Sequence, residues 1–509
     1  MNRLVRNIGY NVTGQLLLLA LSFVSVRYIF TELGKDVLGI IYFTLMLNAL
    51  VIAVLELGVT TTTVKEVSTH RDSDPAYVVK VMRSGAFLYW IGYVLAAITV
   101  LVAAPAFVSR WITLESLSED TAVELLRILG VSSLLALPQT FYVSVFRGLQ
   151  RMGITNVVDV GTTLVQQVGI VVVIRVTGDL RAVAVWIAST YVLRLIVLTS
   201  ILSRLFGWTA LAPRLDREII RRNRGFASHM IAITILATVH TQTDKLMLSR
   251  LLPVGMLGIY GLLYGTLARG GMITSAVAQG AFPTLTELAA STDRAPLLRR
   301  YHRLQDLLCY GLVPPFAFLA FATLPLFSSA LDSATAPVLV APAALLALGF
   351  YLNGTLTIPY FVTLATNRPD IGSRQNVAAL FATLPVTLIA TWKLGLVGAA
   401  GSWVWYQLFA YAYSVPLLCR ECLGISPWQW YRHELGILAL VAGTYGVAAL
   451  VLAVTGMHST AAIAIAYAAA TLVFGLASWR TMAEDSRRAL SDLVRSALRL
   501  RTASQGVAG

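Results

Sequence analysis

The chain has 509 residues, of which 57% are hydrophobic and only 13% carry a charge. A soluble domain usually has about 25% charged residues, so this composition excludes an ordinary soluble protein and favours an integral membrane protein. The formal net charge of +14 would also suit a nucleic-acid-binding protein. However, no basic run is interleaved with aromatic side chains, so nucleic acid is not an expected partner.

Apolar stretches long enough to cross about 30 Å of hydrocarbon follow one another along the chain. They predict an all-α integral membrane protein with about 14 transmembrane helices. In chain order these helices lie near residues 8–30, 37–61, 82–105, 121–146, 154–175, 182–204, 225–249, 256–288, 305–328, 335–364, 373–392, 396–418, 434–455 and 459–479. The first apolar run has no small-residue cleavage site, so it is interpreted as a retained helix.

The loops between these helices are alternately rich and poor in basic residues. With the N-terminus placed in the cytoplasm, 28 of the 39 Lys and Arg residues fall on the cytoplasmic side and 8 on the other side. Because cytoplasmic loops are enriched in Lys and Arg, this split predicts a multi-pass inner (plasma) membrane protein with both termini in the cytoplasm. The basic loops also make anionic membrane lipids expected partners.

Two segments of the chain resemble each other. Arg27 precedes a short loop and Leu38-Gly39-Ile40, and Lys245 precedes a short loop and Leu257-Gly258-Ile259. The cation and the glycine are 12 residues apart in the first copy and 13 in the second. The first copy falls on predicted helices 1 and 2, and the second copy falls on helices 7 and 8. This spacing predicts two six-helix lobes around a central cavity plus two extra C-terminal helices.

This repeat divides the chain into five predicted parts. They are an N-terminal lobe (1–206), a cytoplasmic basic linker (207–224), a C-terminal lobe (225–420), helices 13 and 14 (421–480) and a cytoplasmic amphipathic tail (481–509).

Polar and charged residues inside the predicted helices are the candidate functional residues. A charge at the bilayer centre costs about 2.5–3.5 kcal/mol, and those that occur usually face a cavity or a partner. Arg194 and Arg269 lie near the predicted midplane. The other candidates for substrate binding are Arg27, Lys245, Arg127, Gln166 and Gln242, and the candidates for ion pairing or coupling are Asp244, Glu56, Asp159 and Arg147.

Structural roles for these charges stay open. Arg147 can pair with Asp159, and Asp244 can be a structural partner of a nearby cation. Arg27 and Lys245, at helix ends, can extend toward the headgroups. Prolines inside predicted helices can kink them, and these are Pro138, Pro283, Pro314, Pro315 and Pro359.

Catalytic motifs are absent from the sequence. It has no G-x-x-x-x-G-K-[ST] nucleotide loop, no H-E-x-x-H and no nucleophile elbow, and its outer loops are short. Cys309, Cys419 and Cys422 offer neither a disulfide framework nor four zinc ligands. We therefore expect a protein that is not an enzyme and that uses no cofactor and no metal.

Four segments carry a resemblance to a known family. They are Leu55-Glu56-Leu57-Gly58 with Lys65-Glu66, Phe146-Arg147-Gly148-Leu149-Gln150-Arg151, Thr243-Asp244-Lys245-Leu246-Met247-Leu248 and Phe282-Pro283-Thr284-Leu285. Their order and spacing resemble the Wzx-like oligosaccharide flippases of polysaccharide biosynthesis. That family belongs to the superfamily of multidrug, oligosaccharidyl-lipid and polysaccharide exporters (MOP), as do the multidrug and toxin extrusion proteins and the lipid II flippases. Fourteen helices are closer to the lipid II flippases, whereas many Wzx-like members have twelve.

The resemblance implies a flippase that moves a polyprenyl-diphosphate-linked oligosaccharide from the cytoplasmic to the outer leaflet by alternating access, for cell-surface polysaccharide synthesis. Arg194 and Arg269 would then bind the diphosphate, because guanidinium groups bind phosphate oxygens bidentately. Polysaccharide polymerase and glycosyltransferases are further candidate partners, and a monomer is expected.

Two other functions stay open. A cation-coupled multidrug antiporter of the same fold would need buried acids, which the first predicted helix lacks. A non-transporting scaffold for envelope synthesis is disfavoured because the chain has almost no soluble domain.

Overall fold

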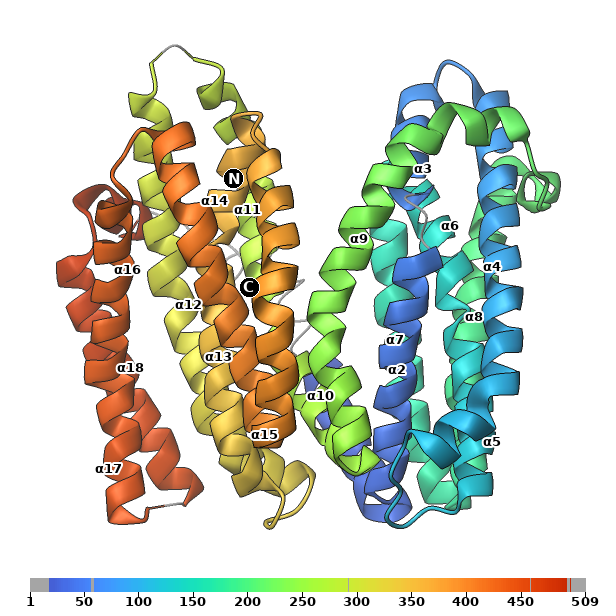
Figure 1. Cartoon of the computed structure of the whole chain (residues 1–509), viewed down its shortest axis with the longest axis horizontal. Helices are drawn as coiled ribbons and strands as arrows, with labels where there is room; N and C mark the ends of the chain where they lie inside the picture. The colour runs from blue at the N-terminus through green and yellow to red at the C-terminus, as the bar shows by residue number, and fades with distance from the viewer. Residues whose placement is uncertain (1–17, 56–58, 292, 458, 492–494, 496–509) are drawn as a thin grey trace, which may run out of the picture. The chain divides into compact units, whose positions relative to one another are not determined.

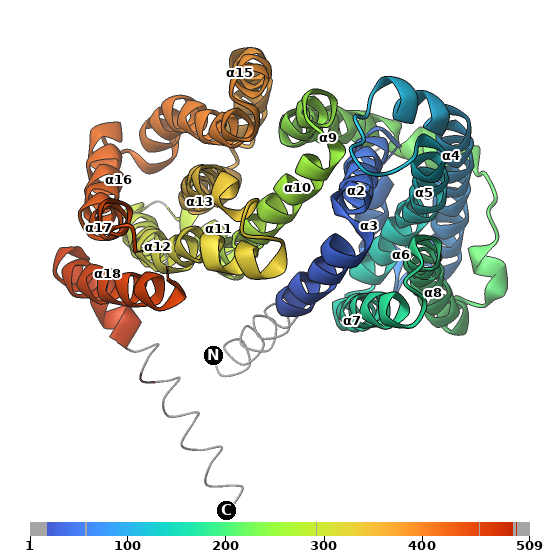
Figure 2. The same cartoon turned by 90° about the horizontal axis from the view of Figure 1, so that it is seen from below.

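A computed structural model describes residues 18–55, 59–291, 293–457, 459–491 and 495, and Figures 1 and 2 show its helices. The described residues form two compact units, an N-terminal unit from Leu18 to Leu262 and a C-terminal unit from Leu263 onward. The described ranges are helical throughout, apart from loops and one isolated bridge between Thr113 and Pro253.

The N-terminal unit opens with a helix over residues 18–28 that ends in the π-helical turn η1 (Ile29–Leu33). It continues with α2 (Lys35–Leu55), α3 (Val59–His70), α4 (Pro75–Arg110), α5 (Glu119–Ser133), α6 (Ala136–Gly148), α7 (Met152–Thr177), α8 (Leu180–Phe206), η2 (Trp208–Leu211), α9 (Arg217–Leu251) and the first part of α10 (Val254–Ala268). Fully buried Met82, Phe141 and Phe146 lie in the core that α4 and α6 share.

The C-terminal unit holds the rest of α10 and all later helices. These are α11 (Gly271–Ala289), α12 (Ala295–Ala330), η3 (Ala336–Leu339), α13 (Val340–Thr355), α14 (Thr357–Ala365), α15 (Asp370–Leu417), η4 (Leu418–Leu423), α16 (Pro427–Val441), η5 (Ala442–Gly446), α17 (Val447–Thr455) and α18 (Thr460–Thr481). Within this unit α16 to α18 pack along α12 (Figures 1 and 2).

Ten helical stretches among the described residues are long and apolar enough to cross a membrane. Large aliphatic side chains such as Val102, Val157 and Val176 are exposed on them, as lipid-facing positions require. The chain is therefore an all-α, multi-pass integral membrane protein.

The predicted helices 373–392 and 396–418 correspond to the two limbs of α15. Gly395 lies between them with φ 54° and ψ −126°, a conformation that is not helical. Glycine reaches positive φ without steric cost, so it allows the chain to reverse there.

Three predicted boundaries need correction. After residue 61 the chain is still helical, because α3 runs to His70. The helix expected from 225 begins at Arg217, since the Asp216 carboxylate accepts hydrogen bonds from the amides of Glu218 and Ile219 at 3.0 and 3.4 Å. Much of the predicted basic linker is thus the first turns of α9.

The helix expected from 434 begins at Pro427. Ser426 caps it by accepting a hydrogen bond from the Trp428 amide at 3.3 Å, and proline occupies the first turn. The Ser426 cap and Pro427 lie about two helical turns before the apolar run that begins at 434. Glu434 therefore lies in the interior of α16.

The border between the compact units falls inside α10, after Leu262. Helix α9 therefore packs with the N-terminal unit, mainly against α2, whereas the repeat assigned residues 225–420 to the C-terminal lobe. The lobe boundaries and their roles in transport stay predictions.

Predicted helices 121–146 and 335–364 are each broken once. The breaks are at Leu134-Leu135, between α5 and α6, and at Leu356, between α13 and α14. Pro138 and Pro359 lie three residues after the last residue of each break, where a proline ring disturbs the preceding helical turn. The following helices, α6 and α14, are each followed two residues after their ends by a residue with a φ of 59°, Gln150 and Asn367. This second correspondence agrees with the predicted internal repeat.

The two glycines of the repeated Leu-Gly-Ile segments lie against each other in the N-terminal unit. A Cβ atom on Gly258 would come within 2.7 Å of the Gly39 nitrogen, and one on Gly39 within 2.2 Å of the Val254 carbonyl oxygen. Helices α2 and α10 therefore meet backbone to backbone, which requires small residues at the contact.

We expect Gly258→Ala to lower the thermal midpoint of the purified protein by several degrees, because the added methyl group forces α2 and α10 apart. Gly161→Ala in α7 is the matched control, since a Cβ there meets no described atom within 4 Å. Its midpoint should be unchanged or slightly higher. Equal midpoints for the two variants, measured in detergent, would contradict the close contact.

Candidate functional site

Arg194 and Asp159 form an ion pair between the neighbouring helices α8 and α7. The Arg194 Nη2 and Asp159 Oδ1 atoms are 2.6 Å apart, and the side chains are 28% and 45% exposed. The buried Arg194 Nε atom has no hydrogen-bond partner among the described residues. Asp159 is thus paired with Arg194 and not with Arg147, which lies exposed at the end of α6.

Asp244 and Lys245 form a more deeply buried group. The Lys245 ammonium lies 3.3 Å from the Asp244 carboxylate and also donates to the Thr241 carbonyl, and the Tyr260 hydroxyl donates to Asp244 at 2.9 Å. Both charged side chains are buried. This arrangement joins α9 to α10 and agrees with a structural role for the pair.

The remaining basic candidates of the N-terminal unit lie elsewhere on it. Arg127 on α5 is exposed and its Nε atom donates to the Leu101 carbonyl at 3.0 Å. Arg27 is exposed near the end of the helix over residues 18–28.

The two candidate glutamines are half-buried, Gln166 on α7 and Gln242 on α9. The Trp186 indole donates to the Gln166 backbone carbonyl at 3.2 Å, which fixes the backbone but leaves the role of the side-chain amide open. Glu56 lies outside the described residues.

Arg269 lies where the predicted helix 256–288 is interrupted. Helix α10 ends at Ala268, and α11 begins at Gly271 after the turn residues Arg269 and Gly270. Interrupted helices often mark binding sites in transporters, because their freed amide groups face the cavity. Arg269 belongs to the C-terminal unit. Within the N-terminal unit the structure pairs Arg194 with Asp159 and Lys245 with Asp244.

A polar pocket of about 360 Å³ opens in the C-terminal unit. It lies between α13–α14 and the two limbs of α15, and its lining includes Asn353, Gln375, Asn376, Tyr406, Gln407 and Ser414. The sequence does not predict this pocket, because its polar side chains are uncharged and come from segments far apart along the chain.

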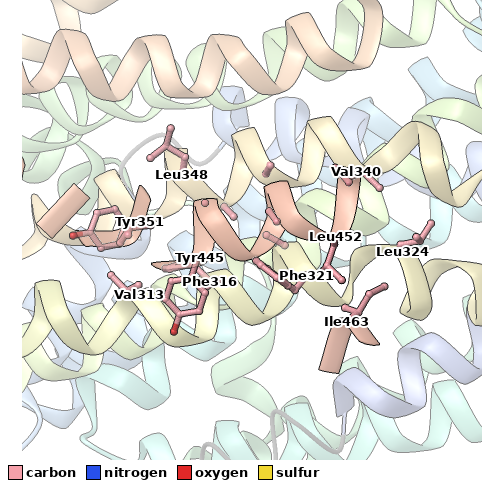
Figure 3. A pocket seen from close by; sticks show the side chains of 18 of the residues that line it. Val313, Phe316, Phe321, Leu324, Val340, Leu348, Tyr351, Tyr445, Leu452 and Ile463 are labelled. Atoms are coloured by element: carbon pink, nitrogen blue, oxygen red, sulfur yellow. The ribbon is translucent and has the colours of Figure 1, made fainter. Parts of the chain in front are cut away.

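A larger cavity of about 650 Å³ lies between α12, α13 and the last helices of the chain (Figure 3). Aliphatic and aromatic side chains such as Phe316, Leu348 and Leu452 line it, and of the described lining residues only Tyr351 and Tyr445 carry a side-chain hydroxyl. The cavity separates the core helices from the two extra helices that hydropathy predicted.

Two buried acids in the C-terminal unit were also missed. The Glu434 carboxylate on α16 accepts hydrogen bonds from Cys309 at 2.9 Å and from Gln305 at 3.2 Å. The Asp306 carboxylate on α12 lies 2.8 Å from the His433 ring and accepts from the Ser486 hydroxyl at 2.9 Å. These acids join α12, α16 and the segment after α18, so they stabilise the position of the extra helices.

The fold is similar to that of solved MOP superfamily transporters. A multidrug resistance transporter of the MATE family, in an inward-facing conformation, is 12% identical with a TM-score of 0.64 over 78% of this chain and 94% of that chain. The lipid II flippase MurJ, in an inward closed conformation, is 14% identical with a TM-score of 0.62 over 92% and 98%. A MOP superfamily transporter from Pyrococcus furiosus is 14% identical with a TM-score of 0.54 over 84% and 93%.

At identities this low the structural similarity establishes the fold alone, which is that of MOP superfamily membrane transporters. No curated protein sequence matches the chain. Residues 4–289 match the family model described as polysaccharide biosynthesis protein, which covers more than half of the chain. The chain therefore belongs to the polysaccharide biosynthesis protein family, and the resemblance seen in the sequence is confirmed. Members of such transporter families are generally not enzymes.

We expect Asp306→Ala to lower the thermal midpoint by about 2–4 °C, because the buried Ser486 hydroxyl and the half-buried His433 ring lose their acceptor at a cost of roughly 1–3 kcal/mol. Asp485→Ala, an exposed change in the same C-terminal segment, should leave the midpoint within about 1 °C. A midpoint of Asp306→Ala equal to that of the control would show that Asp306 does not hold the extra helices.

Proposed function

We propose that this protein is a flippase that moves a polyprenyl-diphosphate-linked oligosaccharide from the cytoplasmic to the outer leaflet for cell-surface polysaccharide synthesis. The family assignment supports a substrate that carries a glycan. Among the described residues, the apolar cavity offers a site for the polyprenyl chain of the substrate.

The observation that carries the proposal is the apolar cavity beside α12 and α13. The hydroxyls of a glycan or a hydrophilic drug would find almost no hydrogen-bond partners on this wall, whereas a polyprenyl chain would meet apolar contacts like those it has in the bilayer. Tyr351 and Tyr445 mark the few polar points of the wall, so the cavity suits a branched hydrocarbon.

The proposal includes fourteen membrane crossings. The ten stretches of sufficient length and hydropathy include α15, whose two limbs each make a crossing. We add the predicted helix 8–30, α9 and the pair α10–α11. The charge bias of the loops then supports cytoplasmic termini and a plasma-membrane location, and two lobes would alternate access to the substrate.

The diphosphate is assigned to Arg269 and Arg194. Arg269 precedes the N-terminus of α11, where helix amides favour an anion. Arg194 is held by Asp159 through one nitrogen, so a phosphate would compete with that carboxylate for the guanidinium. When the phosphate leaves, Arg194 can pair with Asp159 again. This competition therefore favours release of the substrate. The other basic and amide candidates, Arg27, Arg127, Lys245, Gln166 and Gln242, are secondary to these two.

A multidrug antiporter is the second candidate function, favoured by the fold similarity to the MATE transporter. Its cationic substrates would need an accessible acid, and Asp159 is half-exposed but already paired with Arg194. Asp244 is buried against Lys245 and Tyr260. The basic character of the proposed site therefore favours an anionic substrate.

The decisive test is transfer of a polyprenyl-diphosphate oligosaccharide between leaflets in proteoliposomes. We expect Arg269→Ala and Arg194→Ala to reduce transfer by roughly ten- to a hundredfold, the loss of one charge-assisted contact of about 1.5–3 kcal/mol. Arg204→Ala, an exposed change on the same helix as Arg194, is the control. Unimpaired transfer in both variants would reject the site, and drug transport without lipid transfer would favour the antiporter.

Filling the apolar cavity should weaken lipid binding without affecting the charged residues. We expect Ala320→Phe, at a lining position, to weaken binding of a fluorescent polyprenyl phosphate in nanodiscs severalfold, because the added ring occupies space that the chain would fill. Ala468→Phe, exposed on α18 outside the cavity, should bind like the wild type. Equal affinity in the two variants would place the lipid elsewhere.

A further inference from the structure

We propose that the polar pocket between α13–α14 and α15 binds one uncharged sugar residue of the transported glycan. This inference rests on the proposed function, because it assigns the glycan part of the same substrate. The pocket volume of about 360 Å³ lies in the range of small-molecule sites, roughly 300–1,000 Å³.

The pocket presents amides and hydroxyls from several helices. The Tyr406 hydroxyl donates to the Asn376 side-chain oxygen at 3.1 Å, and the Ser414 hydroxyl donates to the Gln375 side-chain oxygen at 2.6 Å. An amide offers two donors and an acceptor, and each sugar hydroxyl is both donor and acceptor. A ring of such groups therefore matches a sugar edge better than it matches a hydrocarbon or a simple ion.

Gln407 supplies the observation that points to a ligand. Its side chain is completely buried and lines the pocket. Its oxygen accepts a long hydrogen bond from Asn353 at 3.5 Å, but its amide nitrogen has no hydrogen-bond partner among the described residues. Because buried donors are almost always satisfied in native proteins, we infer that a sugar hydroxyl or ring oxygen accepts this hydrogen bond.

The charge distribution around the pocket selects the kind of sugar. None of the described lining residues carries a charged side chain. The closest charges along the chain are Asp370 and Arg374, whose side chains lie 3.6 Å apart. Asp370 also pairs with Arg368, which pairs with Glu421. An acidic sugar or a phosphate would therefore lose its hydration without gaining a cation, whereas an uncharged hexose or N-acetylhexosamine would not.

Aromatic rings complete the pocket wall. Tyr406 stacks on Trp403 with ring centroids 5.4 Å apart and planes at 8°, and Tyr360 and Phe361 line another part of the wall. The stack fixes the orientation of the Tyr406 ring, and the apolar face of a pyranose can pack on such a ring while its hydroxyls meet the amides.

The test uses the full chain in nanodiscs and three methyl glycosides, those of a hexose, an N-acetylhexosamine and a hexuronic acid. Saturation-transfer NMR should detect binding of at least one of the two uncharged glycosides and not of the hexuronate. Gln407→Met keeps the side-chain length but removes the amide, and it should reduce the signal at least fivefold. Gln375→Met provides a second variant should the first one fold poorly.

Gln429→Met, an exposed change on α16, is the matched control and should retain the full signal. Absence of binding by both uncharged glycosides, preferential binding of the hexuronate, or an unchanged signal in both folded pocket variants would each overturn the inference. Lipid-linked glycan transfer separates the two claims. Wild-type transfer with no glycoside signal rejects only the sugar site, whereas glycoside binding without any lipid transfer rejects the proposed function.

Discussion

The pairing of charges within the membrane is the constraint on which the rest of this structure depends. A charge in hydrocarbon needs a partner or a water-filled cavity. The ion pairs among the described residues differ in how deeply they are buried. Lys245 is buried against Asp244 and supported by Tyr260, whereas Arg194 meets Asp159 in a pair that is partly exposed. The first arrangement joins α9 to α10, and in the second the Arg194 side chain stays 28% exposed.

In the C-terminal unit the paired charges, the uncharged polar side chains and the apolar side chains lie in separate regions. Buried acids join α12 to α16 through Asp306 and Glu434, and ion pairs around Arg368 lie at the helix ends. The polar pocket that contains Gln407 is uncharged, and the cavity along α12 is almost wholly apolar. In the proposed function the apolar cavity would hold the hydrocarbon chain of the substrate. The polar pocket would hold part of the uncharged glycan, and the arginines would bind the charged diphosphate.

Much of the fold could be predicted because hydropathy and loop charge act on long segments. Ten stretches among the described residues are long and apolar enough to cross a membrane, and the contact between Gly39 and Gly258 joins the two segments that the repeat brought together. Helix starts that depend on one capping side chain, such as Asp216 and Ser426, were missed. In those cases a short polar signal outside the apolar run decides where the helix begins.

Pairs and pockets were harder to predict than helices. The partner of Asp159 depends on how α7 packs on α8, and neighbouring loops in the sequence suggested Arg147 instead. Glu434 is the first residue of the predicted helix 434–455, and its burial against Cys309 and Gln305 depends on the longer helix that begins at Pro427. Gln407, Asn353 and Gln375 come from separate segments, and the sequence pattern gives no sign that they meet.

Native mass spectrometry of the gently purified, full-length protein tests the central claim most directly, because it identifies the lipid that the protein retains. The account predicts an adduct whose mass fits a polyprenyl diphosphate carrying sugars, and its loss in Arg269→Ala. Retention of bulk phospholipids alone, from cells that make the lipid-linked glycan, would contradict a flippase for this class of substrate.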